Sequence, residues 1–474
     1  MEVHLALQTK PRGVTLERIT TGSDALDSVL GGGIPRGSVV FIAGLPGTGK
    51  TILAEQMCWV NARWGESVLY IGTLSEPTVK MIRFAQTFDY FDPALVDKSI
   101  VYADVSGALK LRDADSLLNE IERLIDLHRP ALVVIDSFKA IQDMFPDDFT
   151  FRVFTTAVAV RLSVWETTAL FVGEYNETEI RERPEFAIAD GIIYLYGTEE
   201  GLRQSRLMRI MKMRGTAFFG GDHSFEIGAH GITVYPRMSP TAVGEYSVPT
   251  RRLPSVIPAL TEMMSGGLLE ATTCLITGTT GTGKTLLALS FAVAEALAGG
   301  PVLYVSLEES PDQLIRGSEA FGWDIRALTA SGALHIEHVS PSELNIDRHA
   351  SVIRDRALAL KASLVVIDSV SSFEAAVPDF AKYQGYIWAI TDHFKRAGIT
   401  IIMTSETIPG EPAQAARHTS VFADSLINLQ DAESGDQRRR SLRIVKMRGS
   451  SHDEASRELI LKAPEIRLGP AVLP

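Results

Sequence analysis

Several protein classes are excluded by what the sequence contains little of. Only two of its 474 residues are cysteine, Cys58 and Cys274, and they lie in different halves of the chain, outside any CxxC pair. A disulfide framework or a zinc site needs cysteines at closer and more regular spacings. We therefore expect both residues to be small members of the core.

Positive charge and long apolar runs are also scarce. Lysine and arginine number 46 against 58 aspartates and glutamates, which gives a formal net charge of −12. This balance does not favour nucleic acid as a partner, although it leaves a local basic groove open. No apolar run approaches the roughly 18 residues of a membrane span, and the start MEVHLALQTK lacks the basic and apolar regions of a signal peptide. We expect a cytoplasmic protein with no membrane partner.

What the sequence does contain indicates a folded protein of two domains. Apolar residues make up 45% of the chain and charged residues 22%, a composition that can bury a core. A single core stops growing near about 250 residues, so a chain of this length is expected to divide.

An internal repeat shows where it divides. Three motifs occur twice in the same order, and the two lysines of the first motif are 234 positions apart. Chance does not produce such a series, so the chain is a tandem duplication. The motifs are GLPGTGKT (44–51) and GTTGTGKT (278–285), VVIDS ending at Ser137 and at Ser369, and KMRG (212–215 and 446–449).

Each half is expected to form an α/β domain. In both halves a short apolar run meets a glycine loop, a helical segment follows, and further continuous apolar runs come after it. Such runs are typical of a mainly parallel sheet with helices on both faces. We expect two tandem P-loop domains of this kind, residues 1–240 and 241–474. Residues 236–255, rich in Pro, Ser and Thr, read as the linker between them.

The two glycine loops predict two nucleotide sites. In the pattern GxxxxGK[ST], backbone amides surround the phosphates, the lysine meets the β- and γ-phosphates, and the hydroxyl binds Mg²⁺. ATP and Mg²⁺ are therefore the expected cofactors. The predicted loop residues are Gly44, Gly47, Thr48, Gly49, Lys50 and Thr51, and Gly278, Gly281, Thr282, Gly283, Lys284 and Thr285.

Carboxylates near each loop complete the predicted chemistry. An aspartate that ends a buried strand is costly unless its charge is used, so we predict Mg²⁺ ligation by Asp136 and Asp368, with a helix cap as the alternative. Phosphoryl transfer also needs a carboxylate near the γ-phosphate. The second half offers Glu308 and Glu309, whereas the first half has Ser75 at the first of these positions and keeps only Glu76. The predicted metal set is Thr51, Asp136, Thr285, Glu308 and Asp368, and the predicted catalytic set is Glu308, Glu309, Glu76, Lys50 and Lys284.

Taken together, these motifs resemble the KaiC family of the RecA superfamily, the tandem RecA-like ATPases and autokinases of circadian clocks. The likeness rests on the paired GTGKT loops, LEESPDQLIRGSEAFGWD, the VVIDS strands, and KMRG followed by SSH, and it covers nearly the whole chain. It implies a homohexameric double ring with ATP at each subunit interface, and Kai-type or signalling proteins as partners. It also implies nucleotide contacts, many of them from the neighbouring subunit, by Lys212, Met213, Arg214, Phe321, Arg440, Lys446, Met447, Arg448, Ser450 and His452.

The resemblance also implies a phosphoacceptor, an adjacent Ser and Thr before the last strands of the second domain. Matching back from KMRG places this pair on Ser420 and Val421, so one hydroxyl remains, and Thr419 lies beside it. An unmodified turn is the alternative for this segment.

Three functions are consistent with the sequence. The first is a KaiC-like ATPase with serine/threonine autokinase activity, acting in signalling or circadian-type timing. The second is a RecA- or DnaB-like DNA-dependent motor, for which Arg438–Arg440 is the one candidate basic run. The third is a nucleotide-switched scaffold without turnover, which Ser75 suggests for one half.

Overall fold

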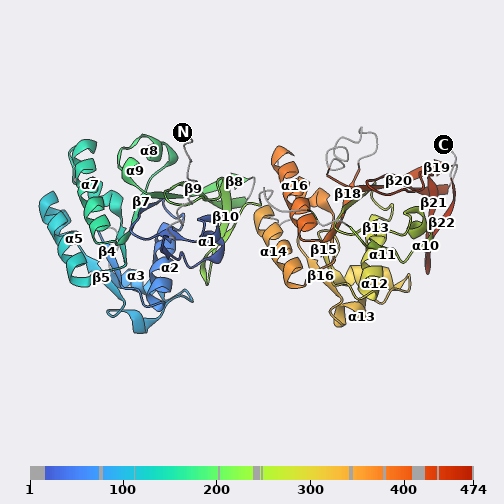
Figure 1. Cartoon of the computed structure of the whole chain (residues 1–474), viewed down its shortest axis with the longest axis horizontal. Coiled ribbons are helices and arrows are strands. Elements are labelled where there is room, and N and C mark those ends of the chain that lie inside the picture. The colour runs from blue at the N-terminus through green and yellow to red at the C-terminus, as the bar shows by residue number, and fades with distance from the viewer. Residues whose placement is uncertain are drawn as a thin grey trace, which may run out of the picture. The chain divides into compact units, whose positions relative to one another are not determined.

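The computed structural model describes residues 16–73, 78–111, 113–200, 203–238, 246, 249–340, 345–376, 380–407, 422–434 and 437–471. The chain divides into two compact units, Met1–Arg237 and Met238–Pro474, each described by itself below (Figure 1). Within the described ranges, no helix is long and apolar enough to cross a membrane.

A nine-stranded sheet forms the first unit, in the order β11-β10-β9-β8-β3-β7-β6-β4-β5. The six strands from β8 to β5 pair in parallel, and β9, β10 and β11 extend this sheet by antiparallel pairing. A separate two-stranded sheet joins β1 to β2. The strands are β1 (Arg18–Ile19), β2 (Ile34–Pro35), β3 (Val39–Gly44), β4 (Val68–Gly72), β5 (Ile100–Asp104), β6 (Leu132–Asp136), β7 (Thr168–Glu174), β8 (Gly191–Glu200), β9 (Arg203–Met213), β10 (Asp222–Gly228) and β11 (Gly231–Tyr235).

Helices cover both faces of this sheet, and two buried clusters separate them from it. Alternate residues of β3 point to opposite faces, so Val40 and Ile42 join the cluster under α2 while Phe41 joins the cluster under α5 and α7. The helices are α1 (Asp24–Val29), α2 (Lys50–Arg63), α3 (Thr78–Ala85), α4 (Ser106–Leu111), α5 (Ala114–His128), α6 (Phe138–Gln142), α7 (Asp148–Val164), α8 (Glu177–Glu182) and α9 (Glu185–Ile188), with a 3₁₀ turn η1 (Pro93–Leu95).

The second unit repeats this architecture. Its sheet has the order β16-β15-β17-β18-β14-β19-β20-β21-β22, and β12 and β13 pair separately. The strands are β12 (Arg252–Leu253), β13 (Leu268–Leu269), β14 (Thr273–Gly278), β15 (Val302–Ser306), β16 (Leu334–His338), β17 (Leu364–Asp368), β18 (Thr400–Glu406), β19 (Ser425–Ser434), β20 (Gln437–Met447), β21 (Arg457–Lys462) and β22 (Glu465–Ala471). The helices are α10 (Pro258–Met263), α11 (Lys284–Leu297), α12 (Pro311–Glu319), α13 (Ile325–Ala330), α14 (Ile346–Ala359), α15 (Val370–Ala376) and α16 (Phe380–Arg396).

The predicted fold class is therefore confirmed: two tandem RecA-like α/β units, each with a mostly parallel sheet between helices. The boundary between Arg237 and Met238 falls inside the predicted linker. Cys58 and Cys274 are both buried. The sequence did not predict the antiparallel strands as such, because their alternating polar residues interrupt the apolar pattern.

Candidate functional site

The first glycine loop joins the end of β3 to the start of α2, at the carboxyl edge of the parallel strands. Gly49 lies just before the helix with φ of +99°, in the left-handed region that favours glycine. A Cβ at this position would also lie 2.9 Å from the Ile227 side chain. The loop therefore needs glycine here to bring its backbone amides to the start of the helix, where anions bind.

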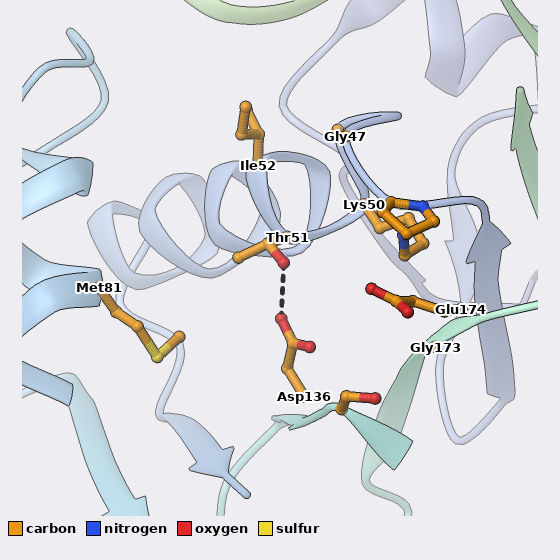
Figure 2. A pocket seen from close by; sticks show the side chains of 11 residues that line it. Gly47, Lys50, Thr51, Ile52, Met81, Asp136, Gly173 and Glu174 are labelled. Atoms are coloured by element: carbon orange, nitrogen blue, oxygen red, sulfur yellow. Dashed lines mark hydrogen bonds between the residues drawn. The ribbon is translucent and has the colours of Figure 1, made fainter. Parts of the chain in front are cut away.

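An open pocket of about 450 Å³ lies beside this loop (Figure 2). On its floor the Thr51 hydroxyl donates a 2.8 Å hydrogen bond to Oδ2 of Asp136, and the Tyr70 hydroxyl donates to the same oxygen at 2.8 Å. The predicted loop hydroxyl and the predicted strand-end carboxylate are thus brought together. Two oxygens at this spacing suit Mg²⁺, which in nucleotide sites takes one or two protein ligands and phosphate oxygens.

Lys50 lies on the same pocket with its amine folded back onto the loop. Its Nζ donates to the Leu45 carbonyl at 2.9 Å. Burial lowers the pKa of Lys50, and the nearby carboxylates Glu174 and Asp136 partly oppose this shift. An additional negative group in the pocket would favour the charged amine further, as the predicted contact with β- and γ-phosphates requires.

The second glycine loop has the same construction between β14 and α11. Lys284 Nζ donates to the carbonyls of Gly278 and Thr279, both at 3.0 Å. Burial lowers the pKa of Lys284, with Glu406, Glu308 and Asp368 opposing the shift. Asp368 is buried and accepts hydrogen bonds from the hydroxyls of Tyr304, at 2.7 Å, and Thr404. Both loops are therefore paired with a carboxylate whose position is set by a tyrosine from the adjacent strand.

The predicted glutamate pair of the second unit lies beside Asp368. Glu308 is exposed, and one of its oxygens accepts a 2.7 Å hydrogen bond from the Ser369 hydroxyl. Glu309 is half-buried, and its burial, together with Asp368 and Glu308, raises its pKa. Glu308 is thus the solvent-facing carboxylate of the pair. The corresponding first-unit residues, Ser75 and Glu76, lie outside the described residues.

Sequence reasoning missed a second repeated carboxylate. Glu174 ends β7 and lines the first pocket, where its carboxylate points towards Lys50 (Figure 2). Glu406 ends β18 at the equivalent position, and its charge acts on Lys284. Both strands lie directly between the glycine-loop strand and the aspartate strand. The repeat contained the signal, since FVGE and MTSE each end an apolar run with a glutamate at equivalent positions of the two halves.

The two KMRG motifs lie at the opposite edge of each sheet from the glycine loops. In the first unit, Met213 pairs with Gly191, which pairs with Val40 at the beginning of β3, whereas the loop follows Gly44 at its end. The four steps from Val40 to Gly44 correspond to about 13 Å. In the second unit Met447 pairs with Ser425, next to Cys274 at the beginning of β14.

The basic side chains at this edge contact the residues just before β8 in the first unit and just before β19 in the second. In the first unit Lys212 Nζ donates to the Ala187 carbonyl at 3.1 Å, and Arg214 lies 3.2 Å from Asp190. In the second, Lys446 Nζ donates to the Ala423 carbonyl at 2.7 Å. Arg448 lies 3.8 Å from Asp424 and is exposed. These residues therefore lie at the opposite ends of the parallel strands from the glycine loop of their own unit.

Arg440 differs from this group although it belongs to the same strand. It pairs with Asp431 near the carboxyl edge, and its Nε donates to the Gly281 carbonyl at 3.2 Å. In this structure it therefore contacts the glycine loop of its own unit. The third arginine of the candidate basic run is thereby used at the predicted nucleotide site.

The remaining predicted contacts are dispersed. Ser450 accepts a 2.8 Å hydrogen bond from Arg252. The Nε2 atom of His452 is buried and has no hydrogen-bond partner in the described part of the chain. Phe321 follows α12, with its ring centroid 6.0 Å from that of Trp323. The predicted phosphoacceptors, Ser420 and Thr419, lie outside the described residues.

Comparison with known proteins gives one consistent result. The family model described as "ATPase: KaiC" matches twice, at residues 19–239 and 253–471. A "Circadian clock oscillator protein KaiC" of Thermostichus vulcanus is 28% identical over 98% of this chain and 92% of its own length. The protein of that name from Parasynechococcus marenigrum is 27% identical over 95% of this chain and 90% of its own. "Circadian clock oscillator protein KaiC 1" of Synechocystis is 27% identical over 95% and 89%.

Proposed function

The chain belongs to the KaiC family of ATPases, and from this premise we propose that it is a ring-forming ATPase that binds Mg-ATP at both glycine loops and phosphorylates itself on serine or threonine in the second domain. Residues 1–240 would form the first ATPase domain and 241–474 the ATPase and autokinase domain. A role in signalling or circadian-type timing, with Kai-type or signalling proteins as partners, is part of the same proposal. The names of its relatives, circadian clock oscillator proteins, support it.

The residues around each loop fit Mg-ATP. The loop amides and Lys50 or Lys284 offer positive charge to the phosphates, and in the first domain Thr51 and Asp136 offer adjacent oxygens to the metal. Bound Mg²⁺ would neutralise charge on the β- and γ-phosphates. Tyr70 and Tyr304 keep the two aspartates oriented. Each domain therefore has the groups for nucleotide binding within its own chain.

One observation supports the proposed ring assembly. Each domain places its glycine loop and its KMRG motif on opposite edges of the sheet. A guanidinium near a transferring phosphoryl group stabilises the charge that develops there. Arg214 and Arg448 are exposed. They lie on the side of the sheet away from the glycine loop of their own domain, where the nucleotide of that domain would bind. A head-to-tail neighbour would supply them with a nucleotide, and repetition of that contact gives a ring where the rotation between subunits closes. Six subunits is the number that the family resemblance implies.

In the second domain the proposed reaction is transfer of the γ-phosphoryl group to a hydroxyl of Ser420 or Thr419. The hydroxyl oxygen forms a bond to the γ-phosphorus, the bond from that phosphorus to ADP breaks, and the hydroxyl proton passes to the Glu308 carboxylate. Glu308 suits this role because it is exposed beside Lys284 and held in place by Ser369. Water in place of the hydroxyl gives hydrolysis.

The first domain is proposed to be the weaker catalyst. Ser75 replaces the carboxylate that corresponds to Glu308. Glu174 is the described carboxylate that lines this pocket besides Asp136, and Glu76 is the other candidate from the sequence. We propose that these two share the role of orienting the attacking water.

Assembly is expected to depend on nucleotide. If a neighbour's KMRG motif contacts the bound nucleotide, ATP and Mg²⁺ should shift the protein from smaller species to a hexamer, because the ligand binds only the assembled site fully. Sedimentation velocity with and without Mg-ATP measures this directly. A monomer at saturating Mg-ATP would contradict the ring.

Self-phosphorylation should be confined to Ser420 or Thr419. Incubation with Mg-ATP is expected to add one phosphate per chain, which peptide mass spectrometry should locate there. The double variant Ser420→Ala, Thr419→Ala should lose the modification and still hydrolyse ATP, since water can replace the hydroxyl. Ser425→Ala, in the nearby strand β19, is the control that should keep it. An unmodified protein that hydrolyses ATP over long incubation would leave a plain ATPase.

A further inference from the structure

Asp424, just before β19, is contacted by two cationic side chains. Its Oδ2 atom lies 2.6 Å from Nζ of Lys395, in the last turn of α16, and accepts a 2.9 Å hydrogen bond from the amide of Thr273. Its Oδ1 atom lies 3.8 Å from the guanidinium of Arg448, which is beyond hydrogen-bond distance. Lys395 is therefore the closer of the two cations.

The backbone around this aspartate is the same in both units. The amide of Arg448 donates to the carbonyl of Asp424 at 2.9 Å, and the amide of Arg214 donates to the carbonyl of Asp190 at 2.8 Å. Each carboxylate also accepts from the amide of the first residue of β14 or β3. The two arginines therefore leave the sheet at the same place relative to their aspartates.

The side-chain contacts of the two arginines differ, and a lysine that the first unit lacks accounts for the difference. Arg214 donates a 3.2 Å hydrogen bond to Asp190, whereas Arg448 makes no such bond with its own aspartate. The position of Lys395 is occupied by Ser163 in the first unit, because α7 and α16 both have 17 residues and begin 232 positions apart. The Ser163 hydroxyl donates to a carbonyl of its own helix.

Lys395 is also the partner that electrostatics favours. The side chains of Lys395 and Asp424 are 21% and 14% exposed, whereas that of Arg448 is 57% exposed. An ion pair that is shorter and further from water is the stronger one. Once Lys395 balances the charge of Asp424, Arg448 gains less by closing the remaining gap.

The lysine leaves this edge of the sheet with a surplus of positive charge. Burial lowers the pKa of Lys446, the charges of Arg448 and Lys395 lower it further, and Asp424 opposes the shift. Three cations thus act on each other around one carboxylate. Such a group of charges attracts an anion from outside the chain, and the nucleotide of a neighbouring subunit would be one.

We infer that Lys395 is a positioning residue, which occupies Asp424 and thereby leaves the Arg448 guanidinium to the nucleotide of the neighbouring subunit. This inference rests on the proposed ring, in which Arg448 acts across the interface. Arg214, held by Asp190, is correspondingly less able to reach a neighbour.

Replacing Lys395 by methionine tests this in the full-length protein. Methionine removes the charge and keeps an unbranched aliphatic chain, so Asp424 should bind Arg448 instead. We expect kcat of the second domain to fall about two- to fivefold, the range of an ion pair near a surface. Nucleotide affinity should stay unchanged, since the arginine stabilises charge that develops during transfer. The hydrolysis that is lost when Lys284→Ala is added measures the second domain alone.

The matched control is Lys361→Met. Lys361 is an exposed lysine between α14 and β17 of the same unit, and its replacement removes the same charge. It should keep kcat.

A second substitution separates positioning of Arg448 from simple support of α16. Asp424→Asn keeps an acceptor for the Thr273 amide and removes the charge that would hold Arg448. Added to Lys395→Met, it should restore kcat to near the wild-type value. If Lys395 only anchors α16, the double variant will be as slow as Lys395→Met or slower, and the inference is wrong.

Arg448→Ala, measured alongside, distinguishes this inference from the proposed ring. If Arg448→Ala lowers kcat and Lys395→Met does not, the ring stands and the role of Lys395 is overturned. If Arg448→Ala leaves kcat unchanged, the arginine serves no neighbour and both proposals fail.

Discussion

Replacing Glu308 by glutamine is expected to reduce phosphoryl transfer in the second domain by about 10²-fold or more, the usual effect of losing a general base. The substitution keeps the size of the side chain and its hydrogen bond with Ser369, so the loss would report the missing proton acceptor. Transfer of label from γ-labelled ATP to the protein measures it. Nucleotide binding should change little, because Lys284 and the loop amides remain.

Glu465→Gln is the matched control for this experiment. Glu465 is an exposed glutamate on β22 of the same unit, and its replacement removes the same charge without touching the site. We expect it to keep full transfer. If Glu308→Gln also keeps it, the half-buried Glu309, whose pKa is raised, would be the better candidate for the base.

Replacing Arg448 by alanine is expected to cost about 10³-fold in turnover of the second domain, the lower end of the effect of an arginine supplied to a transferring phosphoryl group. Its own chain offers it Asp424 at 3.8 Å and no phosphate loop, so the lost partner would be a neighbour's nucleotide. Arg443→Ala, at an exposed position within β20 five residues before Arg448, removes the same charge and should leave turnover unchanged. Steady-state hydrolysis together with nucleotide titration separates loss of turnover from loss of binding.

The sequence predicted the groups proposed to bind the nucleotide and Mg²⁺ better than the groups around them. Lys50, Thr51 and Asp136 were found because each stands in a motif whose spacing follows from the geometry of one loop and one strand end. Their meeting at the carboxyl edge was predictable, since parallel strands end together there. Tyr70 was not, because a tyrosine inside a buried apolar strand looks like an ordinary core residue. Glu174 has only strand-end position and repetition to distinguish it.

The sequence did not predict on which edge of the sheet the KMRG motifs lie, for a different reason. KMRG contains a basic pair that suits a phosphate, yet its side of the sheet depends on the antiparallel return of β9 and β20 and on their register. Lys446 and Arg440 are six residues apart on one strand, and the structure puts them at opposite edges. Both residues belong to basic motifs, so the sequence alone does not distinguish them. The strand pairing does: it places Arg440 at the glycine loop of its own unit and Lys446 at the opposite edge of the sheet.

The most direct test of this account is complementation between two variants, each inactive in the second domain. The Lys284→Ala variant lacks a working glycine loop in the second domain and keeps Arg448. The Arg448→Ala variant keeps the loop and lacks the arginine. Mixed in equal amounts with Mg-ATP, head-to-tail rings would pair an intact loop with an intact arginine at about a quarter of their second-domain interfaces. We predict that the mixture hydrolyses ATP clearly faster than the sum of the two variants measured separately, which also subtracts the contribution of the first domain. A mixture no faster than that sum, in rings shown to contain both variants, would contradict the claim that neighbouring subunits complete each other's sites.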